Sequence, residues 1–340
     1  MPASTPRPYG SESSASGPPS RRPKSMVWVP GGAFLMGSAD FYPEEKPVHR
    51  ARVDGFWMDE HPVTVAEFRR FIKSTDHVTV AETAPDPADF PDADPAQLVP
   101  GSLVFTPPAR PVSLADFRAW WSWVPGAQWR HPEGPGSTLH GLDRHPVTHV
   151  AYLDAVAYAH WAGKALPTEA EWEFAARGGL DGATYAWGDD FAQRGRMMAN
   201  TWQGDFPVHN ELLDGYPRTS PVGRFPPNGY GLVDVTGNVW EWTSQDYTSS
   251  HAAAAASVAP VAAAAGKATC CGPGRAPGAD QSQRSQAGPP TTKVIKGGSH
   301  LCAPNYCLRY RPAARQSQTV DTSTSHLGFR CIIRPRPQST

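Results

Sequence analysis

The chain has 340 residues, a formal net charge of −1 and 39% hydrophobic residues, which suits one large domain or two small ones. The near-neutral charge gives no broad attraction to nucleic acid or to a membrane surface, so we expect neither as a partner. No run of about 18 apolar residues predicts a membrane span, and the N-terminus lacks the apolar core of a signal peptide. The 31 Gly and 37 Pro residues indicate a loop-rich fold.

Composition divides the chain into one domain with tails and an insertion. Residues 1–25 are rich in Ser, Pro and Gly and predict a disordered tail, because they offer little apolar surface to bury. Residues 249–291 are Ala-rich and then Gly/Pro/Gln/Ser-rich, which predicts a disordered insertion. We therefore expect one domain over residues 26–334, interrupted by this insertion, and a short tail over residues 335–340.

The first predicted elements are strands followed by a helix. Residues 26–36 alternate short apolar runs around a Gly pair and predict a hairpin, and residues 50–58 predict a second strand. Thr64 and Glu67 form a capping-box pattern, which predicts the start of a helix. Phe68, Phe71 and Ile72 share one face of that helix and are expected in the core.

The middle of the chain predicts a loop and two further helices. Residues 82–112 are aperiodic and rich in Asp, Pro and Ala, so we expect a long surface loop. Residues 154–161 predict a helix that ends at Gly163. A second capping box, Thr168 to Glu171, predicts a helix that stops at a Gly pair. The tryptophans between these segments are expected to pack in the core or against loops: Trp120, Trp121, Trp123 and Trp129.

The last third combines turns, strands and cysteines. Residues 185–243 are rich in Asn, Asp and Gly, and by themselves predict polar turns. Residues 293–296 predict a strand, and residues 327–334 predict a strand with Arg outward and apolar residues inward that closes the sheet. Five cysteines, an odd number, argue against a disulfide framework. A reducing cytoplasm is the simplest location.

Cys302 and Cys307 are separated by four residues among Gly, Pro, Tyr and Arg. Irregular backbone of this kind can bring two sulfurs together, as a disulfide, a redox pair or a soft-metal site. Thiolates select soft ions such as copper(I) and zinc. Zinc usually takes four ligands, and no second Cys or His pair stands at zinc-finger spacing. By contrast, we expect the vicinal Cys270 and Cys271 to be incidental thiols.

Residues 296–331, KGGSHLC…YCLRYRPAARQ…LGFRC, closely resemble the C-terminal core of formylglycine-generating enzymes. The resemblance covers about residues 26–249 and 292–334. Further matching blocks are VPGGAFLMGS at residues 29–38, WRHPEGPGST at 129–138, the segment 145–179, ANTWQGDFP at 199–207 and PPNGYGLVDVTGNVWEWT at 226–243. It implies an α+β, loop-rich, C-type-lectin-like fold with little regular secondary structure.

The resemblance implies a copper-dependent oxidation. Cys302 and Cys307 would hold copper(I) and leave room for a substrate thiolate. The substrate would be an unfolded or nascent sulfatase segment of the C-x-P-x-R type, whose cysteine becomes Cα-formylglycine with O2 and a thiol reductant. Residues matching family positions around the pair are expected to take part: Ser299, Tyr306, Trp240, Arg315 and His326. We expect a monomer.

The resemblance also implies two structural calcium sites. The first set is Asn200, Thr201, Asp214 and Tyr216, and the second is Asp234, Gly237, Val239 and Glu241. Oxygen ligands on loops are what Ca²⁺ prefers. Asp234 stands where relatives have an amide, which would raise the charge of its site. Cys331, paired in secreted relatives, is expected here as a buried thiol.

Two other functions compete with this interpretation. Domains of C-type-lectin-like fold also serve as binding modules, but such a module needs no cysteine pair. Iron-dependent sulfoxide synthases use the fold with an H-x3-H-x-E motif on a separate helical domain. Here His145 and His149 have the spacing, but Ala151 replaces the acid. We interpret both histidines as structural.

Overall fold

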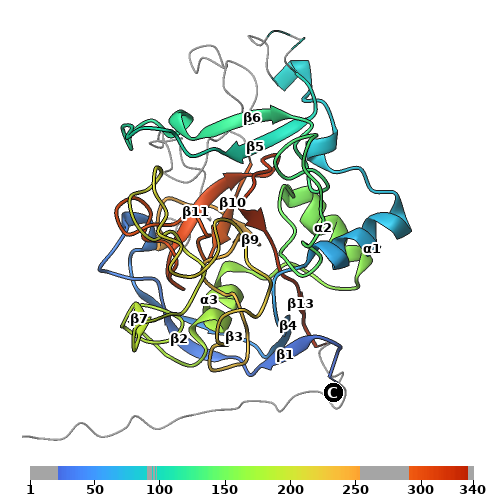
Figure 1. Ribbon diagram of the computed structural model, residues 1–340. Coiled ribbons are helices and arrows are strands. Elements are labelled where there is room, and N and C mark those ends of the chain that lie inside the picture. Colours follow the sequence, from blue (N-terminus) through green and yellow to red (C-terminus); the bar gives the residue numbers. More distant parts are fainter. Residues whose placement is uncertain (1–21, 90–93, 95, 97, 253–290, 336–340) are drawn as a thin grey trace, which may run out of the picture.

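A four-stranded sheet forms the centre of the molecule. The computed structural model describes residues 22–89, 94, 96, 98–252 and 291–335; most of the expected tail and insertion, with Cys270 and Cys271, lies outside them. The sheet has the order β11-β10-β9-β12, seen in the middle of Figure 1. Its strands are β9 (Trp240–Asp246), β10 (Thr292–Lys296), β11 (Arg315–Thr319) and β12 (Leu327–Gly328). The predicted strand at residues 293–296 is confirmed as β10.

The N-terminal strands build two smaller sheets rather than a hairpin. β1 (Met26–Val29) pairs with β4 (Phe56–Asp59), while β2 (Gly32–Met36) pairs with β3 (His49–Val53). The predicted hairpin and the single strand over residues 50–58 are therefore wrong. Gly31, at φ +71°, redirects the chain where a Cβ would come within 2.5 Å of the Gly55 nitrogen, so only glycine allows this crossing.

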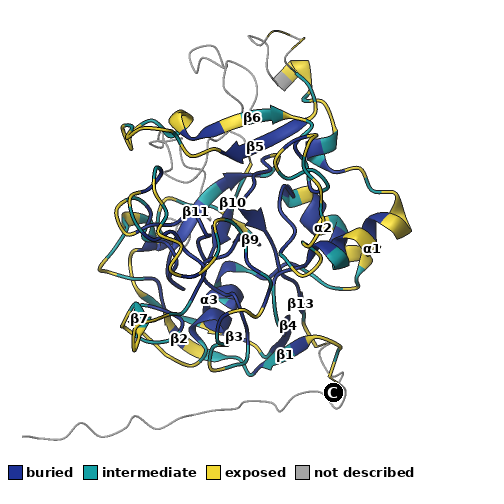
Figure 2. Cartoon of the chain, viewed as in Figure 1, coloured by how far each residue is buried: buried dark blue, intermediate teal, exposed yellow. Residues whose placement is uncertain are grey.

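Three helices surround the central sheet, and their capping boxes are confirmed. They are α1 (Val65–Thr75), α2 (Tyr152–Trp161) and α3 (Glu169–Arg177). Thr64 accepts a hydrogen bond from the Glu67 amide, and Thr168 accepts one from the Glu171 amide, which satisfies otherwise unpaired helix N–H groups. Figure 2 shows α1 and α2 side by side with exposed outer faces, whereas α3 is dark blue beneath the sheet. None of the helices in the described residues is long and apolar enough to cross a membrane.

The segment expected to be a long loop contains a strand. β5 (Gly101–Phe105) pairs antiparallel with β6 (Trp121–Pro125), and Leu103, Val104 and Phe105 are buried. The prediction of an irregular loop over residues 82–112 is therefore wrong in its last part. Periodicity missed β5 because all five of its residues are buried, so no polar alternation marks it. The other short elements are β7 (Ala192–Gln193), β8 (Arg196–Met197) and 3-10 turns at Pro43–Glu45, Val80–Glu82, Pro87–Asp89 and Phe117–Ala119.

The C-terminal segment also differs from its prediction. β12 joins the central sheet, whereas β13 (Ile332–Ile333) pairs with β4 in another sheet. Arg330 between them is 0% exposed, whereas Arg334 is exposed. The expectation of outward arginines over residues 327–334 is therefore wrong for Arg330 and confirmed for Arg334. Cys331 is a buried thiol outside any disulfide, as predicted.

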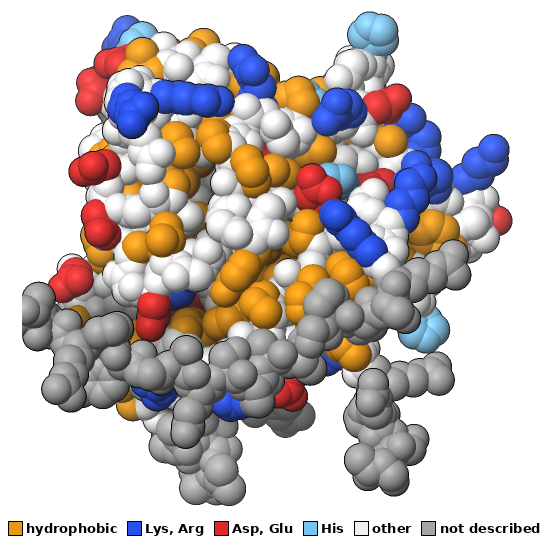
Figure 3. Space-filling view, turned by 90° about the horizontal axis from the view of Figure 1, so that it is seen from below, with side chains coloured by type: hydrophobic (Ala, Val, Ile, Leu, Met, Phe, Trp, Pro, Cys, Tyr) orange, Lys and Arg blue, Asp and Glu red, His pale blue; other side chains and the backbone are white. Residues whose placement is uncertain are grey.

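The molecule is an α+β, loop-rich fold with small mixed sheets. Seen from below, Lys/Arg and Asp/Glu side chains are interspersed around hydrophobic ones on the face shown in Figure 3. The described residues visible on this face thus include side chains of both signs.

Candidate active site

Two thiols meet in the core above the central sheet. The Sγ atoms of Cys302 and Cys307 are 3.1 Å apart, and both residues are 0% exposed. A disulfide has an S–S length of about 2.05 Å, so the structure holds the pair in its dithiol form. Both belong to one hydrophobic cluster with Trp240, Trp242 and Ile295 of β9 and β10. The arrangement presents two soft donors in an apolar, water-poor surrounding.

The backbone around the pair explains why the sulfurs converge. Gly298, at φ +68°, lies so close to the returning chain that a Cβ would be 2.8 Å from the Arg309 oxygen. The loop therefore closes tightly between these two points. Inside it, the Cys302 amide donates to the Ser299 oxygen at 2.9 Å, and the Cys307 amide donates to the Ala303 oxygen at 2.8 Å. These turns direct both side chains to the same side.

A segment far away in sequence fixes the chain just after Cys307. We call residues 41–45 the strap. The Tyr42 hydroxyl accepts a hydrogen bond from the Leu308 amide at 3.0 Å, and Arg311 donates to the Leu308 oxygen at 2.7 Å. Arg311 also pairs with Glu45 through both guanidinium nitrogens, at 2.9 and 2.5 Å. The backbone N–H and C=O of Leu308, the residue after Cys307, are thus both hydrogen-bonded to side chains.

Aromatic rings cover the other side of the cysteine loop. The ring of Tyr306 stacks on Phe206, with centroids 4.7 Å apart and planes 6° apart, and meets Trp120 edge-on at 5.3 Å. Phe105 and Trp202 extend this cluster together with Leu301 and Ala303, which flank Cys302. Tyr306 was a predicted site residue, whereas Phe206 and Phe105 were not singled out.

The other predicted catalytic residues lie at different distances from the pair. The Ser299 amide donates to the Cys302 Sγ at 3.4 Å, so Ser299 is in direct contact with the site. His326 contacts Thr324 through Nδ1 at 2.6 Å and packs 4.8 Å from the Trp121 ring. Arg315 instead forms a two-point ion pair with Glu169 at 2.7 and 3.0 Å. The structure therefore places Arg315 in the ion-pair network beside α3.

The first predicted calcium set has the properties of a cation site. Asn200 is 1% exposed, and its Oδ1 has no hydrogen-bond partner among the described residues. The Asp214 carboxylate accepts from the amides of Thr201 at 3.0 Å and Tyr216 at 2.9 Å, and burial raises its pKa. Since a buried oxygen without a partner is costly, a cation at Asn200 and Asp214 fits the residues present.

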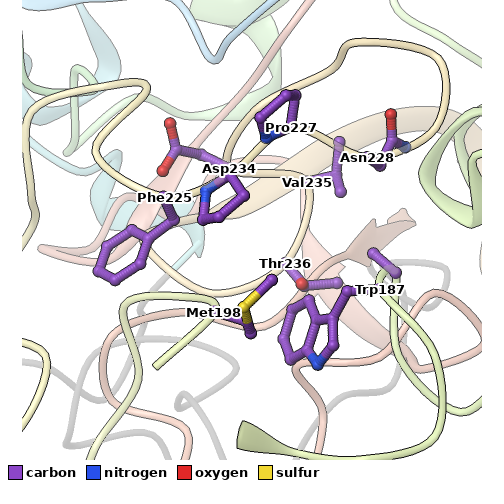
Figure 4. A pocket seen from close by; sticks show the side chains of 10 residues that line it. Trp187, Met198, Phe225, Pro227, Asn228, Asp234, Val235 and Thr236 are labelled. Atoms are coloured by element: carbon purple, nitrogen blue, oxygen red, sulfur yellow. The ribbon is translucent and has the colours of Figure 1, made fainter. Parts of the chain in front are cut away.

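The second predicted calcium set differs, because Arg330 already neutralises one of its two acids, Glu241. The Glu241 carboxylate accepts from Arg330 at 2.7 and 2.8 Å and from the Trp172 indole at 2.7 Å. Asp234 lies at a cavity of about 20 Å³, next to Phe225 in Figure 4. That volume is about one water molecule, and burial raises the pKa of Asp234 to about 6. The described residues contain no cluster of three His, Cys, Asp or Glu for a metal, and Glu241 does not fit a cation site as it stands.

A cavity of about 380 Å³ opens beside β5. Asp154 in its wall is fully engaged, by His77 at 2.9 Å and by the Ala151 amide at 2.9 Å. Leu103 both lines this cavity and packs in the aromatic cluster with Ala303, so one strand connects the cavity to the cysteine loop. The remaining lining residues are Val78, Val80, Thr83, Ala84, Pro85, Asp86, Gly101, Trp123, Leu153, Asp321, Thr322 and Ser323.

The chain matches the model of the sulfatase-modifying factor enzyme 1-like domain over residues 12–335. It is 53% identical to a formylglycine-generating enzyme of Mycobacterium tuberculosis, over 91% of this chain and 98% of that protein. The chain belongs to the formylglycine-generating enzyme family. An inactive Cα-formylglycine-generating enzyme 2 of Bos taurus is 38% identical over 90% of this chain and 87% of that protein. PvdO from Pseudomonas aeruginosa shares the fold, with a TM-score of 0.56 and 23% identity over 90% of this chain and 93% of that chain.

Sequence reasoning singled out the two cysteines that the structure brings together, and it missed much of their surroundings. The strap and the β5 cavity were not anticipated, because each depends on contacts between distant segments. The signal for the strap was present in the acidic run Glu44–Glu45 and the arginines after Cys307. Their opposite charges suggested pairing, but nothing local identified which partners would meet.

Proposed function

We propose that this member of the family oxidises the cysteine of a C-x-P-x-R sulfatase segment to Cα-formylglycine. The observation that carries the proposal is the dithiol pair at 3.1 Å, fully buried and bordered by an aromatic cluster. In balanced form, the thiol side chain of the substrate, one O2, two electrons and two protons give the aldehyde, hydrogen sulfide and water. A thiol reductant supplies the two electrons, and the substrate Cβ loses one of its two hydrogens.

Cys302 and Cys307 are the residues that would hold copper(I), since two thiolates are suitable ligands for that soft ion. Bound there, copper(I) supplies the reactivity toward O2 that no amino-acid side chain provides. The chain itself excludes water, because both thiols are 0% exposed. Ser299 orients the first sulfur through its amide contact at 3.4 Å, and the strap fixes the backbone after the second. Tyr306 and Trp240 close the apolar wall.

The cavity beside β5 offers the segment a place to bind. An extended peptide of five residues spans at most about 18 Å, and we propose that it runs from the cysteine loop along β5 into the cavity. Exposed carboxylates, Asp86 and Asp321, lie among its lining residues and are complementary to the arginine of the motif. Apolar residues such as Leu103 and Trp123 suit its proline.

Mass spectrometry of a C-x-P-x-R peptide, incubated with copper-loaded enzyme, O2 and a thiol, tests the proposal. We expect a mass decrease of about 18, because the thiol side chain becomes an aldehyde. A peptide with Ser in place of Cys serves as the control and should stay unchanged. An unmodified Cys peptide in the presence of fully loaded enzyme contradicts the proposal.

We also propose structural calcium at the first set, together with a cytoplasmic, monomeric enzyme. A ligand that binds only the native state raises stability, by about 2.7 kcal/mol at 100 times its Kd. Chelator-treated protein should therefore melt at lower temperature than protein in calcium. Asn200→Ala should remove this difference, because it deletes the buried Oδ1. Equal melting temperatures with and without calcium contradict the structural role.

A further inference from the structure

One imidazole and two hydroxyl groups form a buried chain of hydrogen bonds that ends at the β5 cavity. His149 and Ser102 are 0% exposed, and Ser323, which lines the cavity, is 5% exposed. The His149 Nε2 lies 2.8 Å from the Pro132 oxygen, and its Nδ1 lies 2.7 Å from the Ser102 Oγ. The Ser102 Oγ in turn lies 2.8 Å from the backbone carbonyl oxygen of Ser323 and 2.9 Å from the Ser323 hydroxyl oxygen, Oγ.

The direction of these hydrogen bonds follows from the chemistry of each group. A carbonyl oxygen only accepts, so the His149 Nε2 carries the hydrogen that points to Pro132. Burial lowers the pKa of His149 to about 4, so the ring is neutral near pH 7 and its Nδ1 is an acceptor. Ser102 has one hydrogen and faces two acceptors, this Nδ1 and the Ser323 oxygen. It therefore has none left for the Ser323 hydroxyl.

The contact between the two hydroxyls consequently requires the hydrogen of Ser323. With that hydrogen directed at Ser102, the Ser323 Oγ offers only lone pairs to the cavity. We propose that His149 and Ser102 are positioning residues that make Ser323 a hydrogen-bond acceptor for a backbone N–H of the peptide bound in the cavity. Ser323 thus selects the register of an extended peptide.

This inference rests on the proposed function for the nature of the bound peptide, and it adds a specificity-determining residue. An extended peptide presents N–H groups at regular intervals along its edge. A neutral acceptor in a mostly apolar cavity favours an N–H that would otherwise stay unpaired. Asp86 and Asp321 cannot replace Ser323 in this role, because both are exposed and remain accessible to water.

The test compares steady-state constants for a C-x-P-x-R peptide. Ser323→Ala should raise KM about fivefold and leave kcat within about twofold, as expected for one neutral hydrogen bond. Ser102→Ala should raise KM similarly, because the freed Ser323 hydrogen can turn toward the peptide. The double variant should show no additional loss. Ser74→Ala, which removes a hydroxyl of α1 that donates to the Phe71 backbone oxygen at 3.0 Å and does not line the cavity, should leave KM unchanged.

Peptides methylated at one backbone nitrogen identify the partner. One methylation position should weaken binding about fivefold with the wild type and have no effect with Ser323→Ala. The Kd of peptides with Ser in place of Cys, from fluorescence anisotropy, gives the same comparison without oxidation. If the wild type forms no aldehyde, the proposed function fails while these Kd values still decide the inference. Two results overturn the inference. One is an unchanged KM and Kd in Ser102→Ala, once its melting temperature shows that the variant is folded. The other is a methylation penalty that persists in Ser323→Ala.

Discussion

The two faces of the central sheet have opposite chemistry. On the face toward α3, Lys296 pairs across the strands with Glu241 and Arg315, and Lys296 binds Glu173 at 2.9 Å. On the other face, Ile295 stands opposite Trp242 in the cluster that contains both site cysteines. We call these the charged face and the thiol face.

The charged face supplies rigidity, and the thiol face supplies reactivity. Glu173 and Lys296 are each 0% exposed, and separating the members of a buried ion pair is costly because each leaves an uncompensated charge. The charged face therefore holds α3 and the sheet in fixed positions. On the thiol face both sulfurs belong to a hydrophobic cluster, so they remain available for a soft metal and a substrate thiol. Mutations on the charged face should change stability, and mutations on the thiol face should change turnover.

Replacement of either site cysteine should have the largest effect. Cys302→Ser or Cys307→Ser exchanges a soft ligand for a hard one, so we expect a loss of peptide oxidation of at least about 1000-fold, the scale of losing an essential catalytic group. Copper(I) binding, measured by competition with a chelator, should weaken in parallel. Cys331→Ser is the matched control, because Cys331 is also a buried thiol. Its backbone amide donates to the Asp59 carboxylate at 3.0 Å, and the substitution keeps this contact, so activity should persist. Full activity of either site variant excludes the two-thiolate proposal.

The sequence predicted what depends on neighbouring residues. The capping boxes at Thr64 and Thr168 were found because both partners lie within four residues. The cysteine pair was found because its loop has a recognisable pattern. β5 was not predicted because its complete burial leaves no polar alternation, and the strap and the burial of Arg330 were not predicted because their partners are distant. Arg330 and Glu241 are 89 residues apart, and no local periodicity carries that information.

Loss of a charge on the charged face should have the next largest effect, on stability. Glu173→Gln removes the carboxylate partner of Arg177 and the nearer carboxylate partner of Lys296, which keeps only Glu169 at 3.7 Å. Removal of one member of such a pair costs about 3–5 kcal/mol, which denaturant unfolding measures. Asp116→Asn, in an exposed pair with Arg118, is the control and should have little effect. A stable Glu173→Gln variant with low kcat at low temperature would reverse the assignment of the two faces.

As the pH falls, the buried histidines should destabilise the fold first, and the charged face should lose stability only at lower pH. Burial lowers the pKa values of His149 and His300 to about 4. His300 belongs to the cysteine loop, and His149 contacts Ser102 of β5. Between about pH 6.5 and 4 the unfolded chain binds more protons at these positions, so stability falls as the pH falls, by up to about 3 kcal/mol for each histidine. Despite its burial, Glu169 on the charged face has a pKa lowered to about 2 by His251, Lys296 and Arg315. Its contribution is lost only below about pH 4.5.

Urea unfolding at several pH values between 7 and 4 measures this order. His300→Gln keeps a donor for the Asn238 oxygen, which accepts from the His300 Nδ1 at 2.8 Å, and lacks the titration. We expect a shallower loss of stability above pH 4.5 in this variant. A slope identical to that of the wild type over this range contradicts the assignment to the buried histidines.

The strap should give the smallest effect and shows how the thiol face depends on distant support. Tyr42→Phe removes the acceptor of the Leu308 amide and keeps the ring against Arg309, whose guanidinium lies 3.7 Å from its centroid. The unpaired amide should cost about 1 kcal/mol or slightly more, and we expect a several-fold loss of kcat because the backbone after Cys307 is less constrained. Tyr230→Phe, whose ring stacks on Phe174 at 5.8 Å on the far side of α3, is the control for loss of a hydroxyl. If Tyr42→Phe lowers stability without changing kcat or copper(I) affinity, the strap stabilises the fold but does not position the second thiol.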